Sequence, residues 1–254
     1  MSLNLSAEVR PDPTRAKPIT DKYEALAAML VRTLLAEAKK AMREQSFMNF
    51  PNVSKMSPNQ FLRFIDRLMS KQASSESQWI EDMSTTAYGQ GRGFSSVVLG
   101  APIEVREKIW KKTSTLVERS TGSFQKMTDD MSADVRRIVA DGILKERTQG
   151  DIIQQIDDLA DTYDYRARRI IRTETMEAVN TGVMDGYRAD EVEKVEWLAA
   201  EGCCDACQAL DGRVFGIDSG VSAPLHPNCR CTLIPVIDIP GQEPRPEEEW
   251  NEEE

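Results

Sequence analysis

Apolar residues recur at helical spacing over most of the first two-thirds of this chain. Between residues 21 and 43 they follow one another every three or four positions, which predicts an amphipathic helix with Asp21 as its N-cap. A second helix is predicted to open at Ser57 and Pro58, because proline is favoured at the first helical position. The apolar face of this second helix comprises Phe61, Phe64, Ile65 and Leu68. A third helix is predicted from about residue 75 to residue 88.

A glycine-rich run at residues 89–93 is expected to interrupt the helices. It lacks the Lys-Ser/Thr pair of a phosphate-binding loop and does not follow a predicted strand, so we interpret it as a flexible loop. Beyond it, Pro102 starts another predicted helix, and residues 132–144 again show helical spacing. Thr148 and Asp151 have the spacing of a capping box and predict the start of a short helix.

A long helix is predicted from Tyr165 to about Tyr187, and three arginines recur at every third position along it. These are Arg166, Arg169 and Arg172. Such a basic face is suited to contact phosphate, as in DNA, or an acidic partner. The alternative is ion pairing with carboxylates of the same region, which we favour slightly because exposed charge runs usually form solvated faces. The carboxylates considered are Asp157, Asp158, Asp161 and Glu174.

The pattern changes after Ala189, where alternating apolar residues favour short strands. Strands are predicted at residues 194–198, 213–217 and 231–236, and the sequence Leu-Asp-Gly at residues 210–212 is typical of a turn. The predicted fold class is therefore α+β, with a mostly helical N-terminal two-thirds followed by a small β-rich C-terminal module. Three short strands would have little hydrophobic core of their own.

Four segments are expected along the chain. Residues 1–19 are rich in proline and poor in large apolar groups, which predicts an extended arm. Residues 20–130 form a helical domain, and residues 131–236 form a second domain of helices followed by the β module. Residues 237–254 are expected to be an acidic, disordered tail.

Charge and composition restrict the function only weakly. The 254 residues include 40% hydrophobic and 29% charged residues, and no run approaches the roughly 18 apolar residues of a membrane span. The net charge of −10 would argue against nucleic-acid binding. However, residues 240–254 carry seven Glu and one Arg, so much of the negative charge belongs to the tail. DNA therefore stays among the possible partners.

All five cysteines and the only histidine lie in one short stretch between Cys203 and Cys231. Two groups of soft ligands are separated by 18 residues, between Cys207 and His226. Tetrahedral zinc sites are commonly built from two such tight turns, each supplying two ligand atoms. The spacing therefore predicts a structural zinc site that pins the β module, and metal binding supplies folding energy in small zinc modules.

The preferred zinc ligands are Cys204, Cys207, Cys229 and Cys231, with His226 in place of one of the last two as the alternative. Cys203 is interpreted as a residue that does not bind the metal.

Three other interpretations of the cysteines are weaker. A redox Cys-x-x-Cys pair normally follows a strand in a βαβ unit, which is not predicted here. A disulfide framework is typical of small secreted proteins. Cysteines buried without metal are common in protein cores.

The order of motifs in the C-terminal half resembles that of a known family. It runs Arg166-Ala-Arg-Arg-x-x-Arg-Thr-Glu-Thr175, Ala178-x-Asn180, Lys194-x-x-Trp197, Cys204-x-x-Cys207, Leu210-Asp-Gly212 and His226-Pro-Asn-Cys-Arg-Cys231. The combined pattern resembles the Mu F-like family of phage minor head proteins, also called phage head morphogenesis proteins, over about residues 130–236. Its most specific part is the Leu-Asp-Gly sequence followed by the His-Pro-x-Cys-Arg-Cys sequence.

The resemblance implies a structural protein of the phage head, at or near the portal vertex. Such a protein acts in head (capsid) assembly and in DNA packaging or delivery. Its implied partners are the portal protein, the major capsid protein and phage DNA, with no membrane partner. It would be assembled in the host cytoplasm and reside in the virion. Residues 20–130, which match no motif, would then bind the portal or the capsid.

An enzyme is the alternative to a structural protein. A zinc-dependent hydrolase or nuclease would use Glu174 or Asp211 as its acid or base, and an ADP-ribosyltransferase-like enzyme would use Arg172 with Glu174. The chain lacks a second histidine and a Ser/His/Asp arrangement, and four protein ligands would close the zinc site. We therefore predict no catalytic residues and favour the structural protein.

Overall fold

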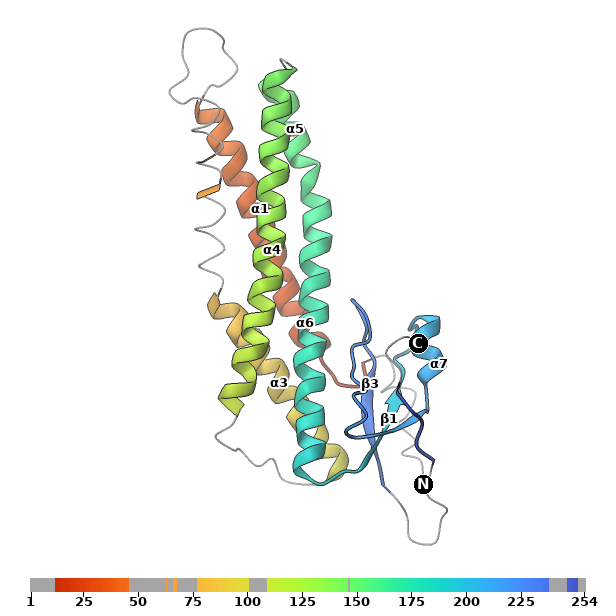
Figure 1. The fold of residues 1–254 in the computed structure, drawn as a ribbon. Coiled ribbons are helices and arrows are strands. Elements are labelled where there is room, and N and C mark those ends of the chain that lie inside the picture. The colour runs from red at the N-terminus through yellow and green to blue at the C-terminus, as the bar shows by residue number, and fades with distance from the viewer. Residues whose placement is uncertain are drawn as a thin grey trace. The chain divides into compact units, whose positions relative to one another are not determined.

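The computed structural model describes residues 12–45, 63, 66–67, 77–100, 109–145, 147–237 and 246–250. Its elements, in chain order, are α1 (Lys17–Gln45), α3 (Ser77–Leu99), α4 (Ile109–Leu144), α5 (Gln149–Asp157), α6 (Leu159–Ala189), β1 (Lys194–Leu198), α7 (Asp205–Leu210), β2 (Val214–Gly216) and β3 (Thr232–Val236) (Figure 1). The predicted α+β class, with helices first and a small sheet last, is confirmed. Within the described residues, no helix has both the length and the apolar character needed to cross a membrane.

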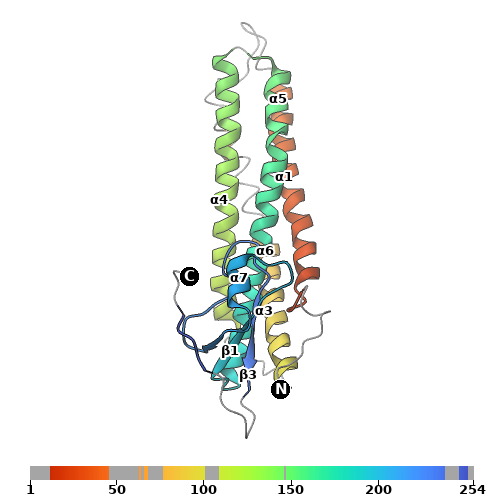
Figure 2. The same ribbon diagram turned by 90° about the vertical axis from the view of Figure 1, so that its right-hand side faces the viewer.

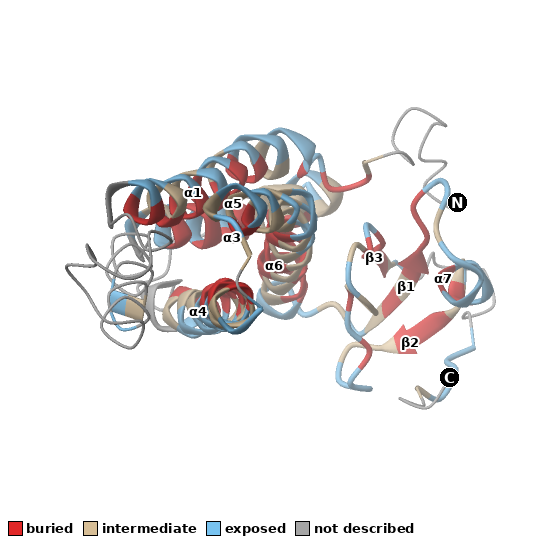
Figure 3. Cartoon of the chain, turned by 90° about the horizontal axis from the view of Figure 1, so that it is seen from above, coloured by how far each residue is buried: buried red, intermediate tan, exposed pale blue. Residues whose placement is uncertain are grey.

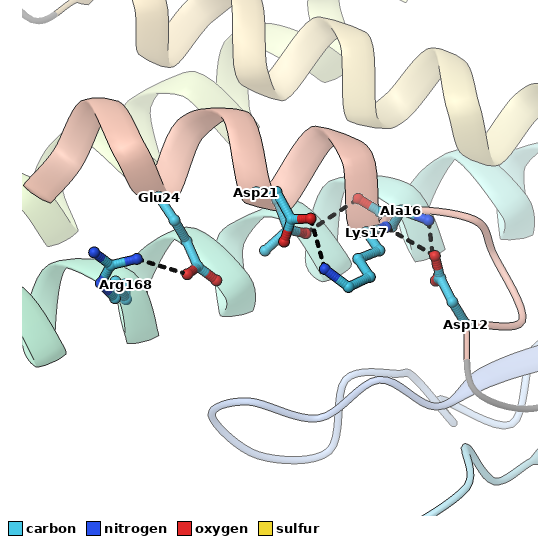
Figure 4. A network of polar contacts seen from close by, with 7 residues as sticks. Asp12, Ala16, Lys17, Asp21, Glu24 and Arg168 are labelled. Carbon is cyan, nitrogen blue, oxygen red and sulfur yellow. Dashed lines mark hydrogen bonds and ion pairs between the residues drawn. The ribbon is translucent and has the colours of Figure 1, made fainter.

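Helix α1 begins earlier than its apolar pattern indicates. It starts at Lys17, and the carboxylate of Asp12 accepts hydrogen bonds from the backbone N–H groups of Ala16 at 3.0 Å and Lys17 at 2.9 Å (Figure 4). The prediction of Asp21 as N-cap is therefore wrong, because Asp21 lies inside the helix and pairs with Lys17 at 2.6 Å. The last three residues of the expected arm, 17–19, belong to this helix.

The predicted break at residues 89–93 is also wrong, because α3 continues through all of its glycines. Two close approaches between helices explain why glycine stands inside them. A Cβ atom at Gly91 would overlap the backbone of Val179 in α6, and one at Gly182 in α6 would overlap the backbone of Tyr88 in α3. These glycines therefore let two helix backbones meet, although their local preference is for a turn.

The other helical predictions agree better with the structure. The capping box is confirmed: the N–H of Asp151 donates to Thr148 Oγ1 at 3.2 Å, and the N–H of Thr148 donates to Asp151 Oδ2 at 3.1 Å. The helix expected over residues 132–144 is the end of α4, which is continuous from Ile109. Pro102 and the apolar face of the helix expected at Ser57 lie outside the described residues.

The chain forms two compact units, each made from separate chain segments. The sheet unit comprises Met1–Lys22, Glu81–Val117 and Arg172–Glu254, and the helical unit comprises Tyr23–Ile80 and Glu118–Ile171. The expected domain boundary at residue 130 falls inside α4.

The helical unit contains segments of long helices that run alongside one another (Figure 2). Trp79 contacts two aromatic rings, with centroid distances of 6.2 Å to Tyr23 and 5.1 Å to Phe124. The buried carboxylate of Glu24 on α1 pairs with Arg168 on α6 at 3.3 Å (Figure 4). Aromatic packing and this ion pair thus join α1, α3, α4 and α6 within the unit.

The sheet unit contains a three-stranded antiparallel sheet in the order β2-β1-β3. Val195 of β1 lies opposite Phe215 of β2, and Trp197 lies opposite Leu233 of β3. The side chain of Trp197 is fully buried, and much of the three strands is buried with it (Figure 3). The same core includes apolar residues of α3 and of the second half of α6: Ala87, Tyr88, Val179, Val183 and Tyr187. The sheet therefore does not rely on a small core of its own, contrary to expectation.

Two features of the C-terminal region were not predicted from the sequence. The segment after Cys204 forms the short helix α7 before the predicted turn. Residues 246–250, part of the tail expected to be disordered, lie against the sheet, where the N–H of Glu248 donates to the carbonyl of Val214 at 2.8 Å. The second depends on contacts between residues distant in sequence, which a local pattern does not contain.

Candidate metal centre

Helix α7 positions the first pair of thiols. Cys204 is the N-cap residue of α7, and Cys207 lies in its first turn and is buried. A hydrogen bond from the backbone N–H of Cys207 lowers the pKa of the Cys204 thiol. The turn therefore directs two sulfur atoms to one side and favours the thiolate form of Cys204, which is the form that binds metals.

His226 comes from the loop before β3 and meets both of these thiols. Its Nε2 lies 3.1 Å from Cys204 Sγ and 3.3 Å from Cys207 Sγ. Its Nδ1 lies 2.9 Å from the carbonyl oxygen of Pro227, which can only accept a hydrogen bond. In the neutral ring the proton is therefore on Nδ1, and the lone pair of Nε2 faces the sulfurs. This is the tautomer that a metal-binding histidine needs.

Cys229 and Cys231 complete the cluster from the same loop. Cys229 Sγ lies 3.7 Å from Cys207 Sγ, and Cys231 Sγ accepts the backbone N–H of Ala200 at 3.4 Å. A hydrogen bond from Cys231 lowers the pKa of Cys229 to about 5, whereas burial raises the pKa of Cys207. One of these buried thiols is thus already disposed to be a thiolate.

The donor atoms form two overlapping groups in the described part of the chain. Cys204, Cys207 and His226 form one group, and Cys207, Cys229 and Cys231 form the other, each within 4.8 Å. Two sulfurs bound to one zinc ion at about 2.3 Å lie roughly 3.8 Å apart, close to the distance between Cys207 and Cys229. All five predicted ligands are therefore brought together, and the donor set fits a metal ion. Cys203 belongs to neither group; its thiol faces Gln208 Oε1 at 3.8 Å.

Two polar residues of α6 anchor the loop that carries His226. Thr173 Oγ1 accepts the N–H of Asn228 at 3.3 Å. Asn180 donates to the carbonyl of Cys231 at 3.3 Å and accepts from Thr232 Oγ1 at 2.6 Å. The Arg-Thr-Glu-Thr and Ala-x-Asn motifs thus hold the second ligand loop, a role that was not predicted for them. The only hint in the sequence was that these motifs precede the cysteines in the order that the resemblance uses.

We expect Asn180→Ala to lower the free energy of unfolding by about 1–3 kcal/mol, because it leaves buried partners at Cys231 and Thr232 without their hydrogen bonds. Urea unfolding of the purified protein would measure the change. Thr181→Ala is the matched control on α6, since Thr181 Oγ1 donates within the helix, to the carbonyl of Glu177 at 2.8 Å. Equal effects of the two variants would contradict the anchoring role.

The three predicted arginines differ in their surroundings. Arg166 pairs with Asp130 at 2.6 Å and lies over the Tyr163 ring at 5.0 Å. Arg169 and Arg172 are exposed, and Arg169 lies over the Tyr165 ring at 5.8 Å. Arg166 therefore has a structural partner, and Asp130 was not among the carboxylates expected to pair with it.

The carboxylates considered for catalysis are held in structural positions. Glu174 is buried on α6, and Asp211 Oδ1 accepts the N–H of Ala199 at 2.9 Å. Within the described residues, neither joins the two groups of candidate metal ligands. Asp211 therefore stabilises the turn between α7 and β2.

Comparison with known proteins identifies the class of this region. Residues 133–234 match the family model of phage Mu protein F like protein, and they include every candidate metal ligand. This region of the chain is therefore similar to the Mu F-like family, as its motifs predict. The similarity suggests a protein of phage head morphogenesis that is found in the virion and interacts with other head components. No curated protein and no solved structure matches the chain.

Proposed function

We propose that this chain is a structural minor head protein at or near the portal vertex, acting in head assembly, and that a zinc ion fastens its C-terminal module. The observation that carries the proposal is the convergence of thiol and imidazole donors within the segment that matches the Mu F-like family. Sulfur and nitrogen donors in this number are those that structural zinc sites use.

Cys204, Cys207, His226 and Cys229 are the proposed ligands. His226 contacts both thiols of the first turn, and the distance between Cys207 and Cys229 suits two ligands of one zinc ion. Four protein ligands leave no open position, which favours a structural over a catalytic ion. Cys231 would then lie beside the ion and hydrogen-bond Ala200 and Cys229.

Metal analysis and portal binding test the two halves of the proposal separately. Elemental analysis of the purified protein is expected to find one zinc ion per chain. Co-expression with the portal protein or the major capsid protein of the same phage is expected to yield a complex, with residues 20–130 providing the contact. Purified protein that contains no zinc would contradict the zinc assignment. Failure to bind either head protein would contradict the proposed location.

The choice of the fourth ligand can be tested on the full chain. His226→Ala is expected to lower zinc affinity at least about tenfold, whereas Cys231→Ala should retain the ion. Among the candidate ligands that the structure describes, His226 is the one that groups with both first-turn thiols. Competition with a chromogenic chelator would measure both affinities. If Cys231→Ala lowered zinc affinity more than His226→Ala, the ligands would instead be the four cysteines predicted from spacing.

The resemblance also implies a role in DNA packaging or delivery, and we propose that the exposed arginines of α6 contact DNA in that role. We expect the double variant Arg169→Gln and Arg172→Gln to weaken DNA binding and to reduce the salt dependence by about two phosphate contacts. Fluorescence anisotropy at several salt concentrations would measure this. Replacement of Arg136 and Arg137, which are also exposed but lie on α4, is the control. An unchanged slope in the α6 variant would leave these arginines without a DNA role.

A further inference from the structure

Residues 246–250 lie along the outer edge of β2. Among the described strands, β2 pairs only with β1, so its other edge is available to a further segment. The carbonyl of Arg213 accepts the N–H of Trp197 at 2.9 Å, and backbone directions alternate along a strand. The carbonyl of Val214 accordingly accepts the N–H of Glu248 at 2.8 Å from the opposite side.

Side chains of this segment match the surface that they meet. Glu248 pairs with Arg213, and Glu247 pairs with Lys194 at 3.7 Å. The ring of Trp250 packs edge-on against Phe215, with centroids 5.7 Å apart at 90°. An extended segment with acidic residues followed by an aromatic residue is therefore recognised by backbone, charge and ring contacts together.

The described contacts of the segment lie at an open surface. A groove of about 690 Å³ is lined by Glu193, residues 216–219 and residues 247–250. Surface ion pairs contribute little, and the carboxylates of Glu193 and Asp218 have the same charge as those of the segment. The segment is thus bound by complementary contacts, but these contacts allow it to dissociate from the edge of β2.

We infer that the β2 edge is a docking site for an acidic–aromatic segment, occupied by residues 246–250 of the same chain and open to the same segment of a second copy. The seated segment defines the chemistry of the occupant, because a second copy offers identical groups to Val214, Arg213 and Phe215. Exchange of an identical element between copies needs no new surface. The inference does not depend on the metal centre or on the proposed function.

A labelled peptide of residues 244–254 tests the site on the full-length protein. The tethered segment competes with the peptide at an effective concentration near the millimolar range. Trp250→Ala in the full chain should weaken this competitor, so the peptide is expected to bind that variant at least about tenfold more tightly than it binds the wild type. Adding Arg213→Glu should remove the gain, because it repels the glutamates of the peptide.

Fluorescence anisotropy gives the affinities, and a peptide with Trp250→Ala is the control. Tighter binding to the Trp250→Ala protein that is lost with Arg213→Glu supports the inference. Equal affinity for the wild type and the Trp250→Ala protein overturns it, as does the lack of binding to both. Binding of the control peptide as tightly as the intact peptide also overturns it, because charge alone would then account for the association.

Discussion

Replacing Cys207 with serine is expected to remove the metal and to destabilise the C-terminal β module. Cys207 is the residue shared by the two groups of candidate ligands, and its sulfur faces both His226 and Cys229. A ligand present at 1,000 times its dissociation constant stabilises the folded state by about 4 kcal/mol, so a loss of at least about this size is expected. Elemental analysis and urea unfolding would measure the two effects.

Cys203→Ser is the matched control, because it makes the same change four positions away in a residue outside both groups. The control should retain the metal and most of the stability. Near-ultraviolet circular dichroism adds a local readout, because the buried Trp197 lies in the same core as Cys207. If Cys207→Ser retained one zinc ion per chain, the proposed ligand set would be wrong. If Cys207→Ser lost zinc without losing stability, the ion would not stabilise the C-terminal module.

Replacing Gly91 with alanine is expected to destabilise the protein by about 3 kcal/mol. The added Cβ would overlap the backbone of Val179, and backbone atoms cannot rotate away as a flexible side chain can. Overpacking of this kind typically costs about 1–3 kcal/mol, and the upper end applies here because two helix axes must separate. Thermal or urea unfolding of the full chain would measure the effect.

The same helix supplies a control with the opposite expected sign. A Cβ atom at Gly93 would meet nothing within 4 Å, so Gly93→Ala should stabilise α3 by about 0.5–1 kcal/mol through helix propensity. Stabilisation by both substitutions would show that the helices separate easily at Gly91. Destabilisation by both would instead indicate that α3 is not helical at these glycines.

Features that depend on neighbours within one turn could be predicted from the sequence. The capping box at Thr148 and Asp151 is local, and it is present in the structure. The strands of the β module also follow from alternation over a few residues. By contrast, the start of α1 was misplaced, because Asp12 reaches the helix across an intervening turn that the apolar pattern does not include.

The glycines of α3 show why local preference was insufficient. Gly91 and Gly93 have the same intrinsic tendency to end a helix, yet α3 passes through both. Packing of α3 against α6 compensates for this unfavourable helix propensity. Gly91 and its neighbour Val179 are nearly ninety positions apart in the sequence. No pattern within α3 identifies that partner.

The sequence alone determined the helical periodicity, the short strands, the family signature and the chemistry of the donor cluster, because these follow from residue type and short spacing. Tertiary structure decided which donors face one another: it brought His226 against Cys204 and Cys207, and it placed Asn180 of α6 under the loop of Cys231. It also placed residues 246–250 on the β2 edge. These outcomes depend on contacts between residues distant in sequence, whose free energies exist only once the chain has folded.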